Sequence, residues 1–429
     1  MTSRVPENKK VLLEIANNFG TPTYAYNSNR IHSQIETLRK HTAGISSRLL
    51  YAMKANSLRP ILQQINKEGM GVDAVSPAEL ELALRIGFAP EHILFSSNNM
   101  TDDEMRRAAS AGVTINIGEL SRLRQYGKTY PGSEICVRLN PRIGAGHHAH
   151  VITAGEESKF GISVDQIDDI ISVAHEFDLQ IIGLHQHIGS GILETRIIWK
   201  AISVLLDAAL NFPDLKFLNL GGGLGVPYRP DEKPLDMAEW ESVIIKPLRK
   251  YRAKHPSRNL EFIFEPGRYI VAESGTLLVE VNTLKPSNDR IFAGVDSGMG
   301  HLLRPVIYGA HHTIYNLSNP DGVPRTYDVV GNICESADFF ARDREVQEIR
   351  EGDILAIMDV GAYGMSMASE YNLRPLPAEI MILENGDTEI ISHRESAEEM
   401  IDRIYPELIR QKVQASTSPS RSNIQDRET

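Results

Sequence analysis

Short apolar runs alternate with segments of helical periodicity from residue 48 to residue 266. The apolar runs end at turn residues, as buried parallel strands do, and the segments between them carry apolar residues at the spacing of one helix face. Repeated units of this kind predict a closed (β/α)8 barrel. The predicted strands are RLLYAMKA, GVDAVS, ILFSS, TINIG, EICVRLN, IIGLHQHIG, FLNLGGG and EFIFEP.

Beyond the barrel, strand-like runs follow one another across turn residues, and a long helical period returns only in EEMIDRIYPELIRQK. This pattern predicts a mostly β domain over residues 273–414, after a barrel over residues 28–272. We expect residues 1–27 to pack with the β domain. Residues 415–429 contain almost no apolar side chains, so we expect them to form a disordered tail.

The composition narrows the class of protein. A chain of 429 residues has room for a barrel and a smaller second domain, and its formal net charge of -11 argues against sequence-independent binding of nucleic acid. We find no bilayer-length apolar stretch and no signal peptide, so we expect a cytoplasmic protein without a membrane partner. The two cysteines, Cys136 and Cys334, lie far apart, which predicts neither a disulfide framework nor a metal site.

Polar residues and glycines gather where the predicted strands end. The carboxyl ends of barrel strands form the active-site face, so these residues are expected to converge. Each also has an ordinary explanation. Lys54 can be a rim residue that faces solvent, and His187 can be a hydrogen-bonded core residue. Ser190 can serve a turn, and Glu265 can pair with Arg268. The strand-end residues are Lys54, Asp73, Arg138, Asn140, His187, Ser190, Gly221, Gly222, Gly223 and Glu265.

These residue types match the needs of pyridoxal phosphate. A lysine forms a Schiff base with this cofactor, backbone N–H groups hold its phosphate, and an acid keeps its pyridine nitrogen protonated. Lys54, the run Gly221–Gly223 and Glu265 supply these three groups. The hydroxyl of Ser190 is a further candidate for the phosphate. No other cofactor accounts for the whole set.

Longer motifs run through nearly the whole chain in a fixed order. They are YAMKAN, GVDAVSPAELELA, VRLNP, SKFGI, GLHQHIGSGI, LNLGGGLGVPY, EPGRYIV, DSGM, LLRPVIYGA, CESADFF, GAYGMSMASEYN and RPLPAE. In order and spacing they resemble the diaminopimelate decarboxylase family. These pyridoxal-phosphate decarboxylases have a barrel like that of alanine racemase, and the wider group includes ornithine and arginine decarboxylases.

The resemblance implies a role for each matching residue. Lys54 would form the Schiff base, His187 would stack on the cofactor ring, and Glu265 would pair with the pyridine nitrogen. The phosphate would be held by Ser190, the glycine run, the EPGR backbone and Tyr371. The expected cofactor ligands are Lys54, Asp73, His187, Ser190, Gly221, Gly222, Gly223, Glu265, Gly267, Arg268 and Tyr371.

The same resemblance implies a set of substrate ligands. A guanidinium binds a carboxylate bidentately, so Arg268 and Arg304 indicate an anionic group at the distal end of the substrate. Glu335 would receive an ammonium group there. meso-Diaminopimelate carries both groups, which predicts its decarboxylation to L-lysine. The expected substrate ligands are Arg268, Arg304, Tyr308, Glu335 and Tyr371.

Cys334 matches the family's proton donor, which makes Lys54, His187, Glu265 and Cys334 the expected catalytic residues. The substrate amine would displace Lys54, CO2 would leave, and Cys334 would then protonate Cα. The family is dimeric, so we expect a homodimer in which Cys334 and Glu335 reach into the partner's site.

Several positions depart from the family pattern. They flank the expected pocket, so a decarboxylase of a larger modified amino acid, in siderophore or antibiotic synthesis, is an alternative. A racemase would need a tyrosine base opposite the lysine, and a regulatory homologue would have lost the cofactor residues. The departures are SSNNM at 96–100 without a following lysine, Ala154 after Thr153, Gly300 and His301 in place of Asn-Asp, and Glu370 before Tyr371.

Overall fold

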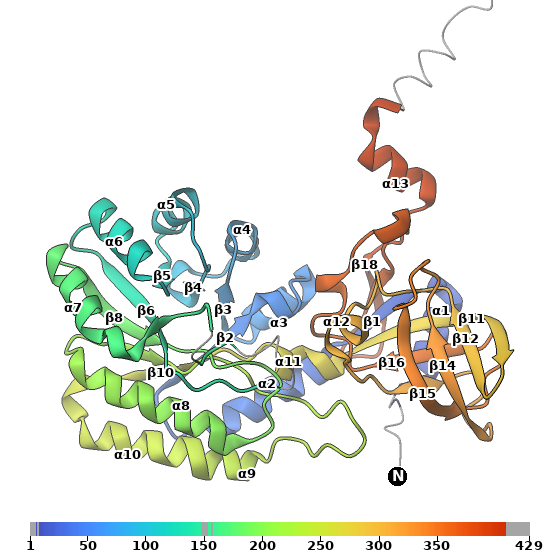
Figure 1. Ribbon diagram of the computed structural model, residues 1–429, viewed down its shortest axis with the longest axis horizontal. Helices are drawn as coiled ribbons and strands as arrows, with labels where there is room; N and C mark the ends of the chain where they lie inside the picture. Colours follow the sequence, from blue (N-terminus) through green and yellow to red (C-terminus); the bar gives the residue numbers. More distant parts are fainter. Residues whose placement is uncertain (1–5, 7, 147–152, 156–157, 409–429) are drawn as a thin grey trace, which may run out of the picture.

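The computed structural model describes residues 6, 8–146, 153–155 and 158–408. A barrel surrounded by helices lies beside a second part built mainly from strands (Figure 1). The predicted disordered tail lies outside the described residues.

Parallel strands close into the predicted barrel. The pairing of β5 with β6 and of β10 with β2 completes the ring. The (β/α)8 class is therefore confirmed. In order around the barrel, the strands are β2 (Ser47–Ala52), β3 (Gly71–Ala74), β4 (Ile93–Phe95), β5 (Thr114–Ile117), β6 (Glu134–Asn140), β8 (Gln180–His185), β9 (Phe217–Asn219) and β10 (Glu261–Phe264). The short strand β7 (Ile162–Ser163) pairs with the end of β6.

A layer of apolar side chains from the barrel strands forms a cluster of its own. Glycines make room for it, because a Cβ on Gly183 would lie 2.1 Å from the ring of Phe217, and a Cβ on Gly71 would lie 2.5 Å from Leu50. Close packing of this kind is typical of barrel interiors. The layer consists of Leu50, Leu94, Cys136, Ile182, Phe217 and Ile263. Cys136 is accordingly a buried packing residue.

Helices cover the outside of the barrel with their apolar faces (Figure 1). α4 shows how the sequence sets their limits: Ser76 accepts from the N–H of Glu79 at its start, and Gly87 adopts a left-handed conformation, with φ of +101°, at its end. The helices are α2 (Ser28–Thr42), α3 (Arg59–Lys67), α4 (Pro77–Ile86), α5 (Asp102–Ser110), α6 (Leu120–Thr129), α7 (Ile167–Glu176), α8 (Thr195–Ala208), α9 (Met237–Trp240) and α10 (Lys246–Lys254).

The second part is a mixed sheet that includes the N-terminal strand β1 (Thr23–Asn27). β1 lies between β11 and β17, antiparallel to the first and parallel to the second. The other strands are β11 (Gly275–Ser287), β12 (Arg290–Val295), β13 (Ile314–Asn316), β14 (Pro324–Val330), β15 (Phe339–Gln347), β16 (Ile354–Met358), β17 (Ala378–Ile382) and β18 (Thr388–Ser392). The predicted β class of this part is confirmed.

In the described part of the chain, four further helices lie between or beside these elements, namely α1 (Lys9–Phe19), α11 (Arg268–Val271), α12 (Arg304–Tyr308) and α13 (Ala397–Ile404). α11 follows the last barrel strand, and α12 belongs to the second part. The first residue of each of these two helices, Arg268 in α11 and Arg304 in α12, was predicted to bind substrate. Among the described residues, no helix combines the length and the apolar character needed to span a bilayer.

Candidate active site

Lys54 lies just beyond the first barrel strand. β2 ends at Ala52 and Met53–Ala55 forms one 3₁₀ turn, so the strand is shorter than the predicted run. Lys54 Nζ donates to Asp73 Oδ2 at 2.9 Å, with 38% of the lysine side chain and 2% of the aspartate side chain exposed. Burial lowers the pKa of Lys54, but the Asp73 and Glu265 carboxylates more than offset it, so this pKa lies above its ordinary value.

Glu265 follows the last residue of β10 and is 4% exposed. Asn219 Nδ2 donates to its Oε1 at 2.6 Å, and His185 Nε2 lies 3.1 Å from its Oε2. Burial raises the pKa of Glu265, but His185 and Lys54 outweigh burial, and the net pKa is lower than that of an ordinary glutamate. Glu265 is therefore a buried carboxylate that stays ionised at neutral pH.

His187 lines the same cavity as Lys54 and Glu265. Its Nδ1 accepts the backbone N–H of Gly222 at 3.1 Å, so the ring proton resides on Nε2. Burial, followed by the positive charges of Lys54 and Arg138, holds the pKa of His187 well below its ordinary value. His187 is therefore a neutral ring of fixed orientation beside the lysine.

The glycine run packs directly against the loops that follow β8 and β10. Gly221 has a φ of +72°, and a Cβ there would lie 2.1 Å from the carbonyl oxygen of Gln186. A Cβ on Gly222 would lie 2.1 Å from the carbonyl oxygen of Glu265. Because these neighbours are backbone atoms, neither position tolerates a side chain without moving a loop of the site.

The predicted residues from several strands meet at one cavity of about 220 Å³. It combines a lysine, a neutral histidine and an ionised glutamate at the carboxyl ends of the strands, where a barrel places its active site. One oxygen of Asp73, Oδ1, is buried there without a partner among the described residues. The cavity is lined by Lys54, Asp73, Val75, Ser96, Asn98, Arg138, Thr153, Phe160, His185, His187 and Glu265.

Arg268 is 5% exposed and lies against Ser190 and Tyr228. Its Nε and Nη2 donate to Ser190 Oγ at 3.2 and 3.0 Å, and its Nη1 donates to the Tyr228 hydroxyl at 2.8 Å. Within the described chain Arg268 forms no ion pair, so it does not neutralise Glu265. The serine predicted to hold phosphate and the arginine predicted to hold substrate are neighbours.

Arg304 is 1% exposed and has hydrogen-bond partners on only part of its guanidinium. Its Nη1 donates to His312 Nε2 at 2.9 Å, and its Cζ lies 4.4 Å from the centre of the Tyr228 ring. Nε and Nη2 are buried and have no partner in the described part of the chain. Arg304, Tyr228 and Tyr308 line a second cavity of about 120 Å³. A buried cation without a counter-charge favours an anionic ligand.

Cys334, Glu335 and Tyr371 form a separate exposed group. The Tyr371 hydroxyl donates to Glu335 Oε1 at 2.7 Å, and Asn372 Nδ2 lies 3.1 Å from Cys334 Sγ. Tyr371 is 42% exposed and the Cys334 side chain is also at the surface. These residues are absent from the lining of the Lys54 cavity in the described chain. Their roles toward cofactor and substrate stay predictions.

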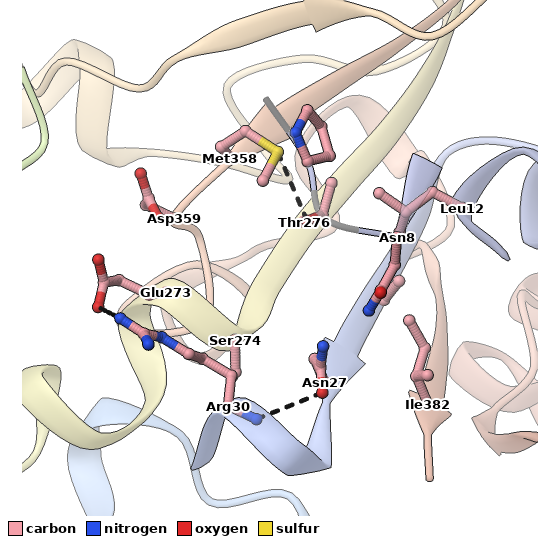
Figure 2. A pocket seen from close by; sticks show the side chains of 12 residues that line it. Asn8, Leu12, Asn27, Arg30, Glu273, Ser274, Thr276, Met358, Asp359 and Ile382 are labelled. Atoms are coloured by element: carbon pink, nitrogen blue, oxygen red, sulfur yellow. Dashed lines mark hydrogen bonds and ion pairs between the residues drawn. The ribbon is translucent and has the colours of Figure 1, made fainter. Parts of the chain in front are cut away.

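Another cavity, of about 190 Å³, lies where α1 and α2 meet the strands β1, β11, β16 and β17 of the second part (Figure 2). Arg30 forms an ion pair with Glu273 on its wall, and Thr276 and Met358 make a further contact. Its walls include none of the residues predicted for the cofactor or substrate. We therefore do not consider it the active site.

The departing stretches at 96–100, 153–154 and 370 fall into two groups. In the first, Asn98 of SSNNM and Thr153, which precedes the departing Ala154, line the Lys54 cavity, and Thr153 Oγ1 donates to the carbonyl oxygen of His187 at 2.9 Å. Glu370 instead forms an ion pair with Arg403 of α13. The first group therefore borders the site, whereas Glu370 anchors a helix of the second part.

The structure adds residues that the strand-end argument missed. His185 and Asn219 bind Glu265, and Tyr228 contacts both arginines. Tyr363, with a left-handed φ of +57°, donates its N–H to the carbonyl of Ala55, and its ring centre lies 4.8 Å from Arg268 Cζ. His185 had a visible signal, because it lies two residues before His187 and shares its side of an extended strand.

Comparisons with known proteins identify the family of this chain. Residues 28–272 match the family described as "Pyridoxal-dependent decarboxylase, pyridoxal binding domain". Diaminopimelate decarboxylase of Methanothermobacter thermautotrophicus is 42% identical over 91% of this chain and 92% of its own length, and that of Pseudomonas aeruginosa is 37% identical over 91% and 94%. The crystal structure of diaminopimelate decarboxylase from Helicobacter pylori, complexed with L-lysine, is 33% identical, covers 92% of this chain and 99% of that chain, and has a TM-score of 0.83. These matches confirm the predicted family and cofactor, and the chain belongs to the pyridoxal-dependent decarboxylases of the diaminopimelate decarboxylase family.

Proposed function

We propose that this protein decarboxylates meso-diaminopimelate to L-lysine and CO2 with pyridoxal phosphate. The observation that carries the substrate assignment is the pair of buried arginines, Arg268 and Arg304, which no carboxylate of the described chain neutralises. A substrate with a distal carboxylate supplies the missing anion. Ornithine and lysine have only the α-carboxylate that leaves as CO2, so they have no second carboxylate for the arginines.

The residues at the barrel mouth fit the cofactor. When bound, pyridoxal phosphate supplies an electron sink for the charge left at Cα as CO2 departs. Lys54 provides the amine that holds the cofactor and is in turn held by Asp73. Glu265, ionised and fixed by Asn219 and His185, would favour the protonated form of the cofactor's ring nitrogen. We assign the phosphate to Ser190, Gly221–Gly223, Gly267 and Tyr371.

Two further residues complete the proposed reaction. The neutral ring of His187, fixed by the Gly222 N–H, covers a face of the ring site and excludes water. The Cys334 thiol gives its proton to Cα after CO2 has left, and the amine of Lys54 then releases the product. Glu335 and Tyr308 contact the distal end of the substrate beside the arginines.

The test is CO2 release from meso-diaminopimelate compared with ornithine, lysine, arginine and a wider panel of α-amino acids. We expect meso-diaminopimelate to give the highest kcat/KM. Absence of turnover with this compound would contradict the proposal, and preferential turnover of a larger amino acid would establish the alternative in its place.

We also propose a homodimer in which Cys334 and Glu335 serve the partner's site. In support, Cys334 is exposed and lies outside the lining of the Lys54 cavity, and Leu373 nearby is a 53% exposed apolar side chain. Mixing inactive Lys54→Ala and Cys334→Ala subunits tests this idea. If the sites are shared, the mixture should show about a quarter of wild-type activity. Half of the dimers then contain one subunit of each kind, and in each mixed dimer one of the two sites has both an intact Lys54 and an intact Cys334. No recovery despite subunit exchange would show that the sites are not shared.

We further propose a cytoplasmic location and a division into a barrel over residues 28–272 and a β domain over residues 273–414 joined by residues 1–27. Both cysteines are free thiols, which suits a reducing compartment. β1 pairs with β11 and β17, which supports grouping residues 1–27 with the β domain. Cell fractionation and limited proteolysis test the two proposals.

A further inference from the structure

His312 contacts Arg304 and is not among the residues that line the cavity of Arg304, Tyr228 and Tyr308. It is fully buried, and both of its ring nitrogens have partners. Arg304 Nη1 lies 2.9 Å from His312 Nε2, and the carbonyl oxygen of Met358 lies 2.8 Å from His312 Nδ1. Neither the family motifs nor the strand-end argument assigned this histidine a role.

The two contacts of His312 fix its tautomer. A guanidinium only donates hydrogen bonds, so Nε2 must accept from Arg304 and the ring proton must reside on Nδ1, which donates to Met358. Burial and the neighbouring charge of Arg304 hold the pKa of His312 well below its ordinary value, which agrees with a neutral ring. His312 therefore presents one fixed acceptor to Arg304.

This acceptor determines which edge of the guanidinium is left for a ligand. Nε and Nη2 of Arg304 share one edge, and both are buried without a partner among the residues described. A carboxylate can accept from both at once, in the bidentate geometry that arginine favours. Because His312 binds Nη1, it turns this edge away from itself.

Tyr228 restrains the same arginine from a second direction. Its ring lies 4.4 Å from Arg304 Cζ, and its hydroxyl accepts from Arg268 Nη1 at 2.8 Å. The rings of His312 and Tyr228 pack edge to face, with centroids 5.4 Å apart at 77°. Tyr228 thus contacts two buried cations, Arg304 through its ring and Arg268 through its hydroxyl and its ring.

We propose that His312 is a positioning residue, which orients Arg304 so that its Nε and Nη2 edge binds the distal carboxylate of the substrate. This inference rests on the proposed function. It assigns His312 to the recognition of one carboxylate and not to the chemistry at Cα.

Two variants separate the contacts of His312. Asparagine places its amide near the position of Nδ1, so His312→Asn keeps a donor for Met358 and loses the acceptor for Arg304. Glutamine places its carbonyl oxygen near the position of Nε2, so His312→Gln keeps the acceptor for Arg304. A comparison of the two reports on the bond to Arg304, because both variants replace the ring with an amide.

The readout is ligand binding to the holoenzyme by calorimetry, together with kcat and KM for meso-diaminopimelate. Decarboxylation at one end leaves the distal carboxylate in L-lysine, whereas cadaverine has the same two amines and no carboxylate. In His312→Asn we expect the KM for meso-diaminopimelate and the Kd of L-lysine each to rise about tenfold, as for loss of one hydrogen bond to a charged group. The kcat and the Kd of cadaverine should stay within about twofold, and His312→Gln should recover most of the L-lysine affinity.

Several results would overturn the inference. An unchanged Kd of L-lysine in His312→Asn would exclude the positioning role, as would equal weakening of L-lysine and cadaverine. Equal losses in the two variants would show that the acceptor for Arg304 is not what matters. If the wild-type enzyme releases no CO2 from meso-diaminopimelate, the proposed function itself is wrong. If the wild type is active and His312→Asn binds L-lysine as the wild type does, only the role of His312 is wrong.

Discussion

Removing the charge of Asp73 should make Lys54 a stronger nucleophile in the apoprotein. Lys54 Nζ and Asp73 Oδ2 are 2.9 Å apart, and the pKa of Lys54 lies above its ordinary value. The ammonium form of Lys54 therefore predominates at neutral pH. At any pH below that pKa, the fraction of uncharged, reactive amine rises about tenfold for each unit by which the pH is raised or the pKa is lowered. Asp73→Asn keeps the shape of the side chain and removes its charge, so the pKa of Lys54 should fall.

The geometry sets the size of this effect. Unit charges 2.9 Å apart interact by about 6 kcal/mol at an effective dielectric constant of about 20, and by about 1.4 kcal/mol in bulk water. Because 38% of the Lys54 side chain is exposed, solvent screens the pair and the lower part of that range applies. We expect about 1.5–3 kcal/mol, which corresponds to a fall of about one to two units in the Lys54 pKa.

The assay is the initial rate of Schiff-base formation after apoprotein is mixed with pyridoxal phosphate. The rate is measured from the absorbance at about 420 nm across a range of pH. At mildly alkaline pH the Asp73→Asn rate should exceed the wild-type rate by about ten- to a hundredfold. The ionisations of the cofactor itself are common to both proteins. Asp103→Asn is the matched control, because Asp103 lies on α5 and, within the described residues, its ion pairs are with the exposed arginines Arg106 and Arg107.

An unchanged or slower rate in Asp73→Asn, with apoprotein that is still folded, would refute this reasoning. It would mean that Asp73 does not govern the protonation of Lys54. A change of equal size in Asp103→Asn would show that the rate reports net charge and not the contact between Asp73 and Lys54.

Other predictions test the remaining contacts of the site. Lys54→Ala should abolish both the absorbance near about 420 nm and CO2 release, and retention of either would exclude Lys54 as the cofactor lysine. Glu265→Gln should lower kcat by about 10²–10³-fold while the cofactor still binds, because a neutral amide no longer favours a protonated ring nitrogen; steady-state kinetics measure this, and an unaltered kcat would contradict it. Gly222→Ala should destabilise the fold by about 1–3 kcal/mol in chemical denaturation, since its Cβ would lie 2.1 Å from the Glu265 carbonyl, and wild-type stability would show that the loop moves freely.

The sequence predicted the barrel well because its signals are local. Apolar runs and helical periods each depend on neighbouring residues, and the last residues of the strands identify the active-site face. The predicted run through Lys54 was too long by three residues, since β2 gives way to the turn Met53–Ala55. Apolar character alone does not mark where a strand leaves the barrel.

Contacts between distant segments could not be predicted in the same way. Tyr228 meets Arg304 through the packing of the second part against the barrel, and His312, eight residues after Arg304, meets it through the segment that follows α12. No periodicity signals either contact. β15, with the sequence FFARDREVQ, carries many charged side chains and only weak apolar alternation, so periodicity does not mark it as a strand. Its pairing with β14 defines it as a strand.

The position of β1 has a consequence for how the chain is made. Thr23 pairs with Ala378 on one side and with Leu278 on the other, so a strand synthesised before the barrel lies between two strands synthesised after it. The barrel strands between them are synthesised in the interval, and their parallel neighbours are close in sequence. The barrel is therefore expected to form first, while β1 waits with both edges unpaired. A chain released before β17 is synthesised would keep one of those edges open, and such prematurely ended chains should be prone to aggregate even though their barrel sequence is complete.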